Sequence, residues 1–293
     1  MKVLRLAACA VALSFAHAGG AAAGMGSPAA MQARYVALKE APGHGQFHRP
    51  LHLLSSESST GLSGEIHAIL DHPFSTTATA LNRPSQWCDV LILHLNTKYC
   101  RPSADGEGAL LHLRIGRKYD QPMEQAYRVD FAYRVAVETA DYLQVTLTAG
   151  EGPLGTSDYR IVLEATPAAD GRRTLIRLSY SYAFGVVGRL AMKTYLGTAG
   201  RDKVGFTLAG SQAGGKPLYI GGMRGVVERN TMRYFLAIEA HLGALSAPTP
   251  GRMEKSLRDW FDGSERYPRQ LHEMEREAYL SMKRREHSRQ QAG

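Results

Sequence analysis

Apolar and polar residues alternate through five successive segments between residues 110 and 184, and this pattern constrains the fold more than any other feature. Successive side chains of a strand point to opposite faces, so the pattern predicts an antiparallel sheet with one face on a core and the other in water. Ala169-Asp170-Gly171 is typical of a hairpin turn between two of the strands. The repeated apolar positions are Leu111, Leu113 and Ile115; Tyr127, Val129, Phe131, Tyr133, Val135 and Val137; Leu143, Val145 and Leu147; Tyr159, Ile161 and Leu163; and Ile176, Leu178, Tyr180, Tyr182 and Phe184.

Helical patterns lie on both sides of this predicted sheet. Before it, residues 65–71 are expected to form a first strand, and Ser75 is a natural N-cap for a helix over 76–81. Pro84 suits the first turn of a second helix. After the sheet, we expect a helix around 190–196 and then a glycine-rich loop. One long amphipathic helix follows, because Val227, Thr231, Tyr234, Ile238, His241 and Leu245 recur at helical spacing.

The N-terminus has the features of an export signal. Lys2 and Arg5 precede a short apolar stretch that ends in the cleavage pattern Ala16-His17-Ala18, with Ala21-Ala22-Ala23 as an alternative site. The apolar stretch is too short to span a bilayer, so we predict a removable signal peptide over residues 1–23 and a periplasmic or secreted protein. Residues 24–63 lack a sustained period and are expected to form a loosely ordered lead-in, with a short helix near Met31.

Two cysteines, Cys88 and Cys100, remain after Cys9 is removed with the signal. An oxidising compartment and an even count favour a disulfide between them, and two free buried thiols are the alternative. The bridge requires a chain reversal, since residues this far apart on one extended strand could not meet. A helix carrying Cys88 and a following strand carrying Cys100 would supply that reversal.

Composition and motifs exclude several classes of function. The chain is 44% hydrophobic and 21% charged, which is globular rather than disordered, and removal of Lys2 and Arg5 reduces its formal charge from +8 to +6. We expect no nucleic-acid binding and at most weak attraction to anionic membranes. Residues 210–216 match a phosphate loop up to the lysine, but Pro217 stands where a Ser or Thr should hold magnesium. His44, His48 and His52 are better explained as a polar loop than as metal ligands, so no metal or cofactor is expected.

The residues also carry a family resemblance. Leu70-Asp71-His72-Pro73-Phe74, Ala80-Leu81, Pro84 and Trp87 are similar to the opening of START-like proteins, the SRPBCC superfamily, and the helix over 225–245 resembles that superfamily's closing helix. The resemblance covers residues 64–245. It implies an α+β helix-grip fold, in which a curved antiparallel sheet wraps around a long C-terminal helix. Residues 246–293 are then expected to be a charged, partly helical and solvent-facing extension.

START-like proteins hold hydrophobic ligands between the sheet and the last helix, and the resemblance therefore implies a cavity in this chain. We predict non-covalent binding or transport of a lipid or another hydrophobic small molecule. One alternative is a cyclase-like enzyme on the same scaffold, with Glu228 or a pocket tyrosine or histidine as general acid or base. Another is an envelope interaction protein that uses the charged extension. The cavity candidates are Trp87, Tyr127, Phe131, Tyr133, Tyr180, Tyr182, Glu228, Arg229, Tyr234 and Ile238.

Overall fold

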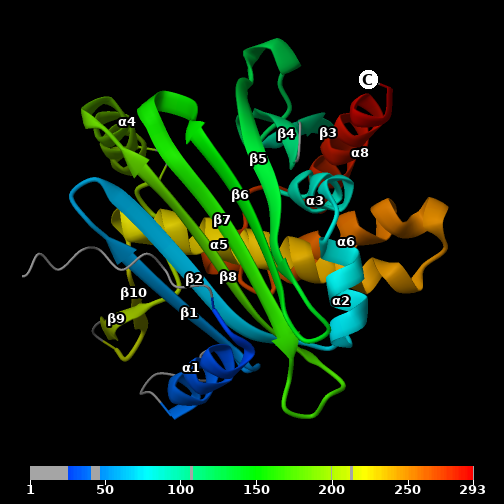
Figure 1. Cartoon of the computed structure of the whole chain (residues 1–293). Helices are drawn as coiled ribbons and strands as arrows, with labels where there is room; N and C mark the ends of the chain where they lie inside the picture. Colours follow the sequence, from blue (N-terminus) through cyan, green and yellow to red (C-terminus); the bar gives the residue numbers. More distant parts are fainter. Residues whose placement is uncertain (1–25, 41–46, 106–107, 199, 212–213, 293) are drawn as a thin grey trace, which may run out of the picture.

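An eight-stranded antiparallel sheet, in the order β1-β2-β8-β7-β6-β5-β4-β3, forms the centre of the molecule (Figure 1). The computed structural model describes residues 26–40, 47–105, 108–198, 200–211 and 214–292, so the predicted signal peptide lies outside the described residues. The strands are β1 (Leu51–Glu57), β2 (Gly61–Leu70), β3 (Thr97–Asp105), β4 (Gly108–Ile115), β5 (Tyr127–Glu138), β6 (Leu143–Glu151), β7 (Thr156–Pro167) and β8 (Thr174–Phe184).

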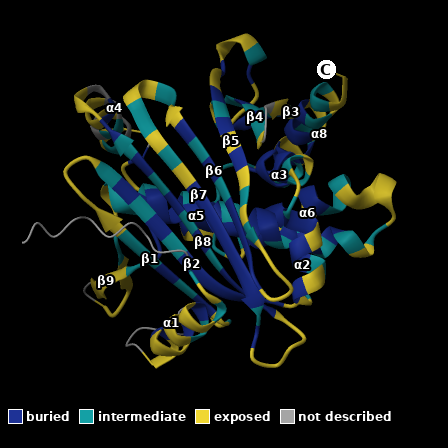
Figure 2. Ribbon diagram, viewed as in Figure 1, coloured by how far each residue is buried: buried dark blue, intermediate teal, exposed yellow. Residues whose placement is uncertain are grey.

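The alternation in the sequence produces the register of the sheet. Leu163 pairs with Val145 on one side and with Leu178 on the other, and all three side chains are buried against the core. The predicted hairpin between β7 and β8 is present, and Gly171 adopts the positive φ of 67° that this turn requires. Figure 2 shows the buried positions concentrated in the central strands and the long helix.

Helix α5 (Gly222–Gly243) packs on strands β1, β2 and β8 and is the helix that the sheet grips. Its buried apolar residues include Val227, Phe235 and Ile238. The sheet is open rather than closed into a barrel, since β1 and β3 are its two edges. The predicted α+β helix-grip class is therefore confirmed.

Two short helices, α2 (Phe74–Leu81) and α3 (Pro84–Leu91), connect β2 to β3. Pro84 occupies the first turn of α3, as the sequence predicts. Ser75 is not the N-cap of α2, because the helix already begins at Phe74 and Pro73 takes the cap position without a side-chain hydrogen bond.

The segment between β8 and α5 holds helix α4 (Val186–Gly197), which extends the helix expected around 190–196. A small antiparallel pair, β9 (Leu208–Ser211) and β10 (Pro217–Tyr219), follows where the sequence indicates only a glycine-rich loop.

The short helix expected near Met31 is present, but the prediction that the rest of residues 24–63 is a loosely ordered lead-in is wrong for most of the described residues. Helix α1 (Pro28–Glu40) packs through Met31 and Tyr35 on the face of the sheet opposite α5, and β1 pairs with β2 over its full length. Strand β1 escapes detection because only Leu51 and Leu53 are buried, Leu54 breaks the alternation, and the other residues are polar. The sheet thus begins at Leu51 rather than near Gly64.

The C-terminal extension is helical, as predicted, but it is not a solvent-facing arm. Helix α6 (Arg252–Glu265) packs on α5, a short α7 (Pro268–Leu271) follows, and α8 (Arg276–Ala292) packs on β3 and α6. Each of α6 and α8 carries an apolar face within its charged sequence. The fully buried side chains on that face include Leu257, Trp260, Tyr279 and Leu280.

Cys88 on α3 and Cys100 on β3 form a disulfide with a Cα–Cα distance of 5.2 Å. The helix-to-strand reversal that the sequence indicates brings them together, and both residues are buried. In the part of the chain that the structure describes, no helix is long and apolar enough to cross a membrane.

Candidate functional site

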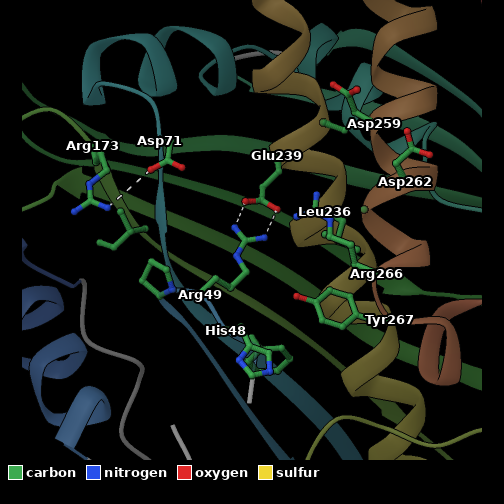
Figure 3. A pocket seen from close by; sticks show the side chains of 15 residues that line it. His48, Arg49, Asp71, Arg173, Leu236, Glu239, Asp259, Asp262, Arg266 and Tyr267 are labelled. Carbon is green, nitrogen blue, oxygen red and sulfur yellow. Dashed lines mark hydrogen bonds and ion pairs between the residues drawn. The ribbon is translucent and has the colours of Figure 1, made fainter. Parts of the chain in front are cut away.

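A groove of about 800 Å³ lies beside the beginning of β1, where α5 and α6 meet (Figure 3). Most of its charged side chains already have partners. Arg49 forms two hydrogen bonds with the carboxylate of Glu239, and Arg173 lies 3.9 Å from Asp71. Because these charges neutralise one another, the groove has the character of a polar surface depression rather than of a ligand site.

A second hollow lies between the sheet and α5, where a helix-grip fold would hold a ligand. It consists of two adjoining chambers of about 160 and 300 Å³. Residues of α3, β4 and β5 contribute to the wall of the inner chamber, and residues of α4 and the beginning of β7 to that of the outer chamber. The residues that line both chambers are Asn96, Pro153, Tyr159, Tyr180 and Asn230.

A cluster of tyrosine rings forms one part of the wall of this cavity. Tyr159 of β7 stacks on Tyr182 of β8 with ring centroids 5.3 Å apart, and Tyr180 lies 5.2 Å from Tyr234 of α5. Burial raises the pKa of Tyr180 well above its ordinary value and also raises that of Tyr234, so both hydroxyls stay neutral. The rings thus present flat, uncharged surfaces with polar edges.

His94 lines the inner chamber and is held in one tautomer. Its Nδ1 accepts a hydrogen bond of 3.2 Å from the backbone N–H of Asn96, which leaves the ring proton on Nε2. The buried Nε2 has no hydrogen-bond partner within the described residues, and the ring stacks on Tyr234 at 4.9 Å. Burial, and then the positive charges of Arg233 and Lys283, hold the pKa of His94 well below its usual range. His94 is therefore a neutral hydrogen-bond donor at the cavity wall.

The outer chamber is lined by three cationic side chains, Lys118, Arg229 and Arg233. Behind them, Glu273 accepts hydrogen bonds from Lys118 at 2.5 Å and from Arg233 at 2.7 Å. Lys203 also lies 3.3 Å from Glu273. Burial and the charge of Arg233 lower the pKa of Lys118 to about 8. Burial alone would raise the pKa of Glu273, but the neighbouring charges of Arg233, Lys118 and Lys203 outweigh it and lower that pKa to about 2. Positive charge therefore dominates this part of the cavity.

Five of the ten residues predicted from the sequence line the cavity. Phe131 and Tyr234 line the inner chamber, Tyr182 and Arg229 line the outer chamber, and Tyr180 lines both. Contact of these residues with a ligand stays a prediction.

The other five predicted residues lie elsewhere. Trp87, Tyr133 and Ile238 are core residues outside the cavity wall, and Trp87 donates its indole N–H to the carbonyl of Leu81. Tyr127 is 48% exposed, because it stands at the first position of β5, beyond the cover of α5.

Glu228 is fully buried but faces away from the cavity. Its carboxylate accepts hydrogen bonds from the backbone N–H groups of Phe206 and Thr207 and from the hydroxyls of Ser55 and Thr207. These contacts fasten the chain before β9 to α5 and β1. The position of Glu228 contradicts the prediction that it lines the cavity, and with it the idea that it acts as an acid or base there.

Several residues of the cavity wall were not predicted from the sequence, among them His94, Asn96, Lys118 and Asn230. Asn96 and Lys118 lie in connections at the ends of β3 and β4, where no periodicity indicates which side chain turns inward. Asn230 lies between Val227 and Tyr234 on α5, and its place on the helix could have indicated a cavity position.

Comparison with known proteins finds no matching family model and no matching curated protein. Among solved structures, the chain is similar to norcoclaurine synthase from Thalictrum flavum, with 15% identity, a TM-score of 0.34, and coverage of 47% of this chain and 86% of that one. A conserved protein from Geobacillus kaustophilus is 13% identical, with a TM-score of 0.35 and coverage of 63% of this chain and 95% of that one. The Zhui aromatase/cyclase from Streptomyces sp. R1128 is 12% identical, with a TM-score of 0.31 and coverage of 48% of this chain and 74% of that one. These values are too low to assign the chain to a family or to an activity. The function is therefore argued from the cavity itself.

Proposed function

We propose that this protein binds a small, ring-containing hydrophobic molecule in the cavity between the sheet and α5. The observation that carries the proposal is the cluster of Tyr159, Tyr180, Tyr182 and Tyr234 in the wall of a hollow between the sheet and α5. Ligand sites in proteins are typically concave and largely apolar, with a few polar groups that fix orientation. Here the polar residues that line the inner chamber include His94 and Asn230.

We also propose that binding takes place outside the cytoplasm. The signal-like N-terminus supports this, and so does the disulfide between Cys88 and Cys100, since structural disulfides persist mainly in oxidising compartments.

Titration with phenylnaphthylamine, a neutral aromatic dye that fluoresces when it leaves water, tests the binding proposal. The wild-type protein should bind it saturably. Asn230→Trp places an indole where the two chambers meet and should weaken binding by about tenfold or more, a loss of about 1.4 kcal/mol. Asn82→Trp, at the end of α2 and away from the cavity, is the matched control and should bind as the wild type does. Equal binding by both variants would show that the dye lies elsewhere.

A cyclase-like enzyme is the second candidate, and one observation favours it. An imidazole with a displaced pKa lies at the cavity wall, as such an enzyme requires. Because the Nε2 proton of His94 is fixed by the contact of Nδ1 with Asn96, the ring could donate a hydrogen bond to a carbonyl oxygen but could not readily accept a proton.

The two candidates can be separated by identifying the small molecules that co-purify with the protein. Native mass spectrometry of the wild type and of His94→Phe would reveal the retained compounds. If the protein only binds, both forms should carry the same compound in different amounts. If it is an enzyme, the variant should accumulate a different compound, the unconverted substrate.

A further inference from the structure

We propose that the natural ligand is an aromatic acid, with its anionic group beside Lys118, Arg229 and Arg233 and its rings among the tyrosines. This inference rests on the proposed function, because it names the chemical class of molecule for the same cavity.

The charge distribution of the outer chamber supports an anion. Within the described residues, its lining includes the three cations and no carboxylate. Glu273, behind the wall, forms ion pairs with Lys118, Arg233 and Lys203, so one carboxylate is shared among three cations. A cluster of like charges in a partly buried site is unfavourable by itself, and an anionic ligand would relieve the repulsion.

The shape of the cavity supports rings rather than long chains. The two chambers, of about 160 and 300 Å³, fall near the lower end of the range for sites that bind small molecules. They are too small to enclose the two acyl chains of a phospholipid. The stacked pair of Tyr159 and Tyr182 borders the outer chamber, so a ring placed there would lie against aromatic faces and close to the cations.

The inner chamber supplies a second recognition point. Nε2 of His94 donates to no described group, and an unpaired buried donor is costly unless a ligand or water accepts its proton. An oxygen carried on the ring system, at the end opposite the anionic group, would satisfy it. The ligand that fits both chambers is thus a flat acid with an acceptor oxygen at its far end.

Two dyes that share one ring system test the inference. Anilinonaphthalene sulfonate is the anionic counterpart of phenylnaphthylamine, so the ratio of their affinities measures the preference for a negative charge. We expect the wild type to bind the sulfonate at least about tenfold more tightly than the neutral dye. Lys118→Met and Arg229→Gln should each lower this ratio by about threefold or more. Lys216→Met, which removes the same charge from the exposed β9–β10 turn, should leave the ratio unchanged.

The outcomes separate this inference from the proposed function. Binding of neither dye would overturn both. Binding of the neutral dye with an equal or weaker affinity for the sulfonate would overturn only the aromatic acid. An equal fall of the ratio in Lys216→Met would also overturn it, because the preference would then come from the overall charge of the protein. Thermal unfolding of each variant confirms that it is folded at the temperature of the titration.

Discussion

The Lys283 ammonium lies 2.6 Å from Oε2 of Glu286, three residues further along α8, and both side chains are fully buried. Lys98 of β3 binds the other oxygen of the same carboxylate at 3.0 Å. Lys283 also donates to the backbone carbonyls of His94 and Thr97, and burial lowers its pKa to about 8. One carboxylate thus holds two buried cations and fastens α8 to the domain.

Glu286→Gln should lower the free energy of unfolding by about 3–5 kcal/mol, because it leaves two buried ammonium groups without their carboxylate. Glu254→Gln is the matched control. Glu254 is partly exposed and binds Arg258 and Arg284, so its loss should cost less than about 1 kcal/mol. Urea unfolding of both variants makes the comparison, and losses of similar size would contradict the role assigned to Glu286.

Removal of the Cys88–Cys100 disulfide should destabilise the protein by about 2–3 kcal/mol, as expected for closure of a short loop. The Cys88→Ala/Cys100→Ala variant and the reduced wild type should unfold at similar urea concentrations, below that of the oxidised wild type. Reducing agent should have no effect on the double variant. If reducing agent also leaves the unfolding of the oxidised wild type unchanged, the disulfide does not contribute to the stability of the protein.

Glu228→Gln should reduce stability by about 2–3 kcal/mol, since its carboxylate accepts hydrogen bonds from two backbone N–H groups and two hydroxyls. The affinity for phenylnaphthylamine should stay the same, because Glu228 does not line the cavity. A large loss of dye affinity in a variant of near-normal stability would contradict this prediction and indicate that Glu228 takes part in binding.

His94 should remain neutral when an exposed histidine becomes protonated. Its pKa is depressed in the folded protein, so below about pH 6.5 the unfolded chain binds a proton that the folded chain does not. Stability therefore falls as pH decreases through that value, by about 1 kcal/mol between pH 7.5 and 5.5 for this residue. His94→Phe removes this contribution, so its stability should depend less on pH than that of the wild type. NMR titration of the His94 ring gives a direct check, and a mid-point near 6.5 would contradict the prediction.

The alternation of side chains was sufficient to predict the strands from β4 to β8, because one face of the sheet packs on the main core along these strands and a shift by one residue would turn Leu163 or Leu178 away from that core. The helices around Cys88 and along α5 were predictable for similar reasons. Strand β1 was not, since its polar half lies at the sheet edge, where pairing with β2 rather than burial defines the strand.

The candidate site was predictable only in part. Alternation indicates which face of β8 carries Tyr180 and Tyr182, and these residues do line the cavity. Alternation does not distinguish a cavity wall from a filled core, and for this reason Tyr133 and Ile238 were predicted to line the cavity although they are core residues. His94, Asn96 and Lys118 come from connections whose path depends on tertiary packing. The sequence did not indicate the position of Glu228, because its partners come from β1 and the segment before β9, far away in sequence.

The packing of α8 also affects the tendency of the chain to aggregate during synthesis. Strand β3 is an edge of the sheet, and the backbone N–H of Cys100 on its outer side is occupied by the side chain of Gln290 from α8. Ribosomes produce β3 well before α8, so the nascent chain carries an unprotected edge that invites strand addition by another molecule. Chains cut off ahead of α8 would keep that edge permanently and should precipitate or form β-rich aggregates. Helix α8 thus covers the edge of a strand that lies almost two hundred residues earlier in the chain, and this cover should keep the protein soluble.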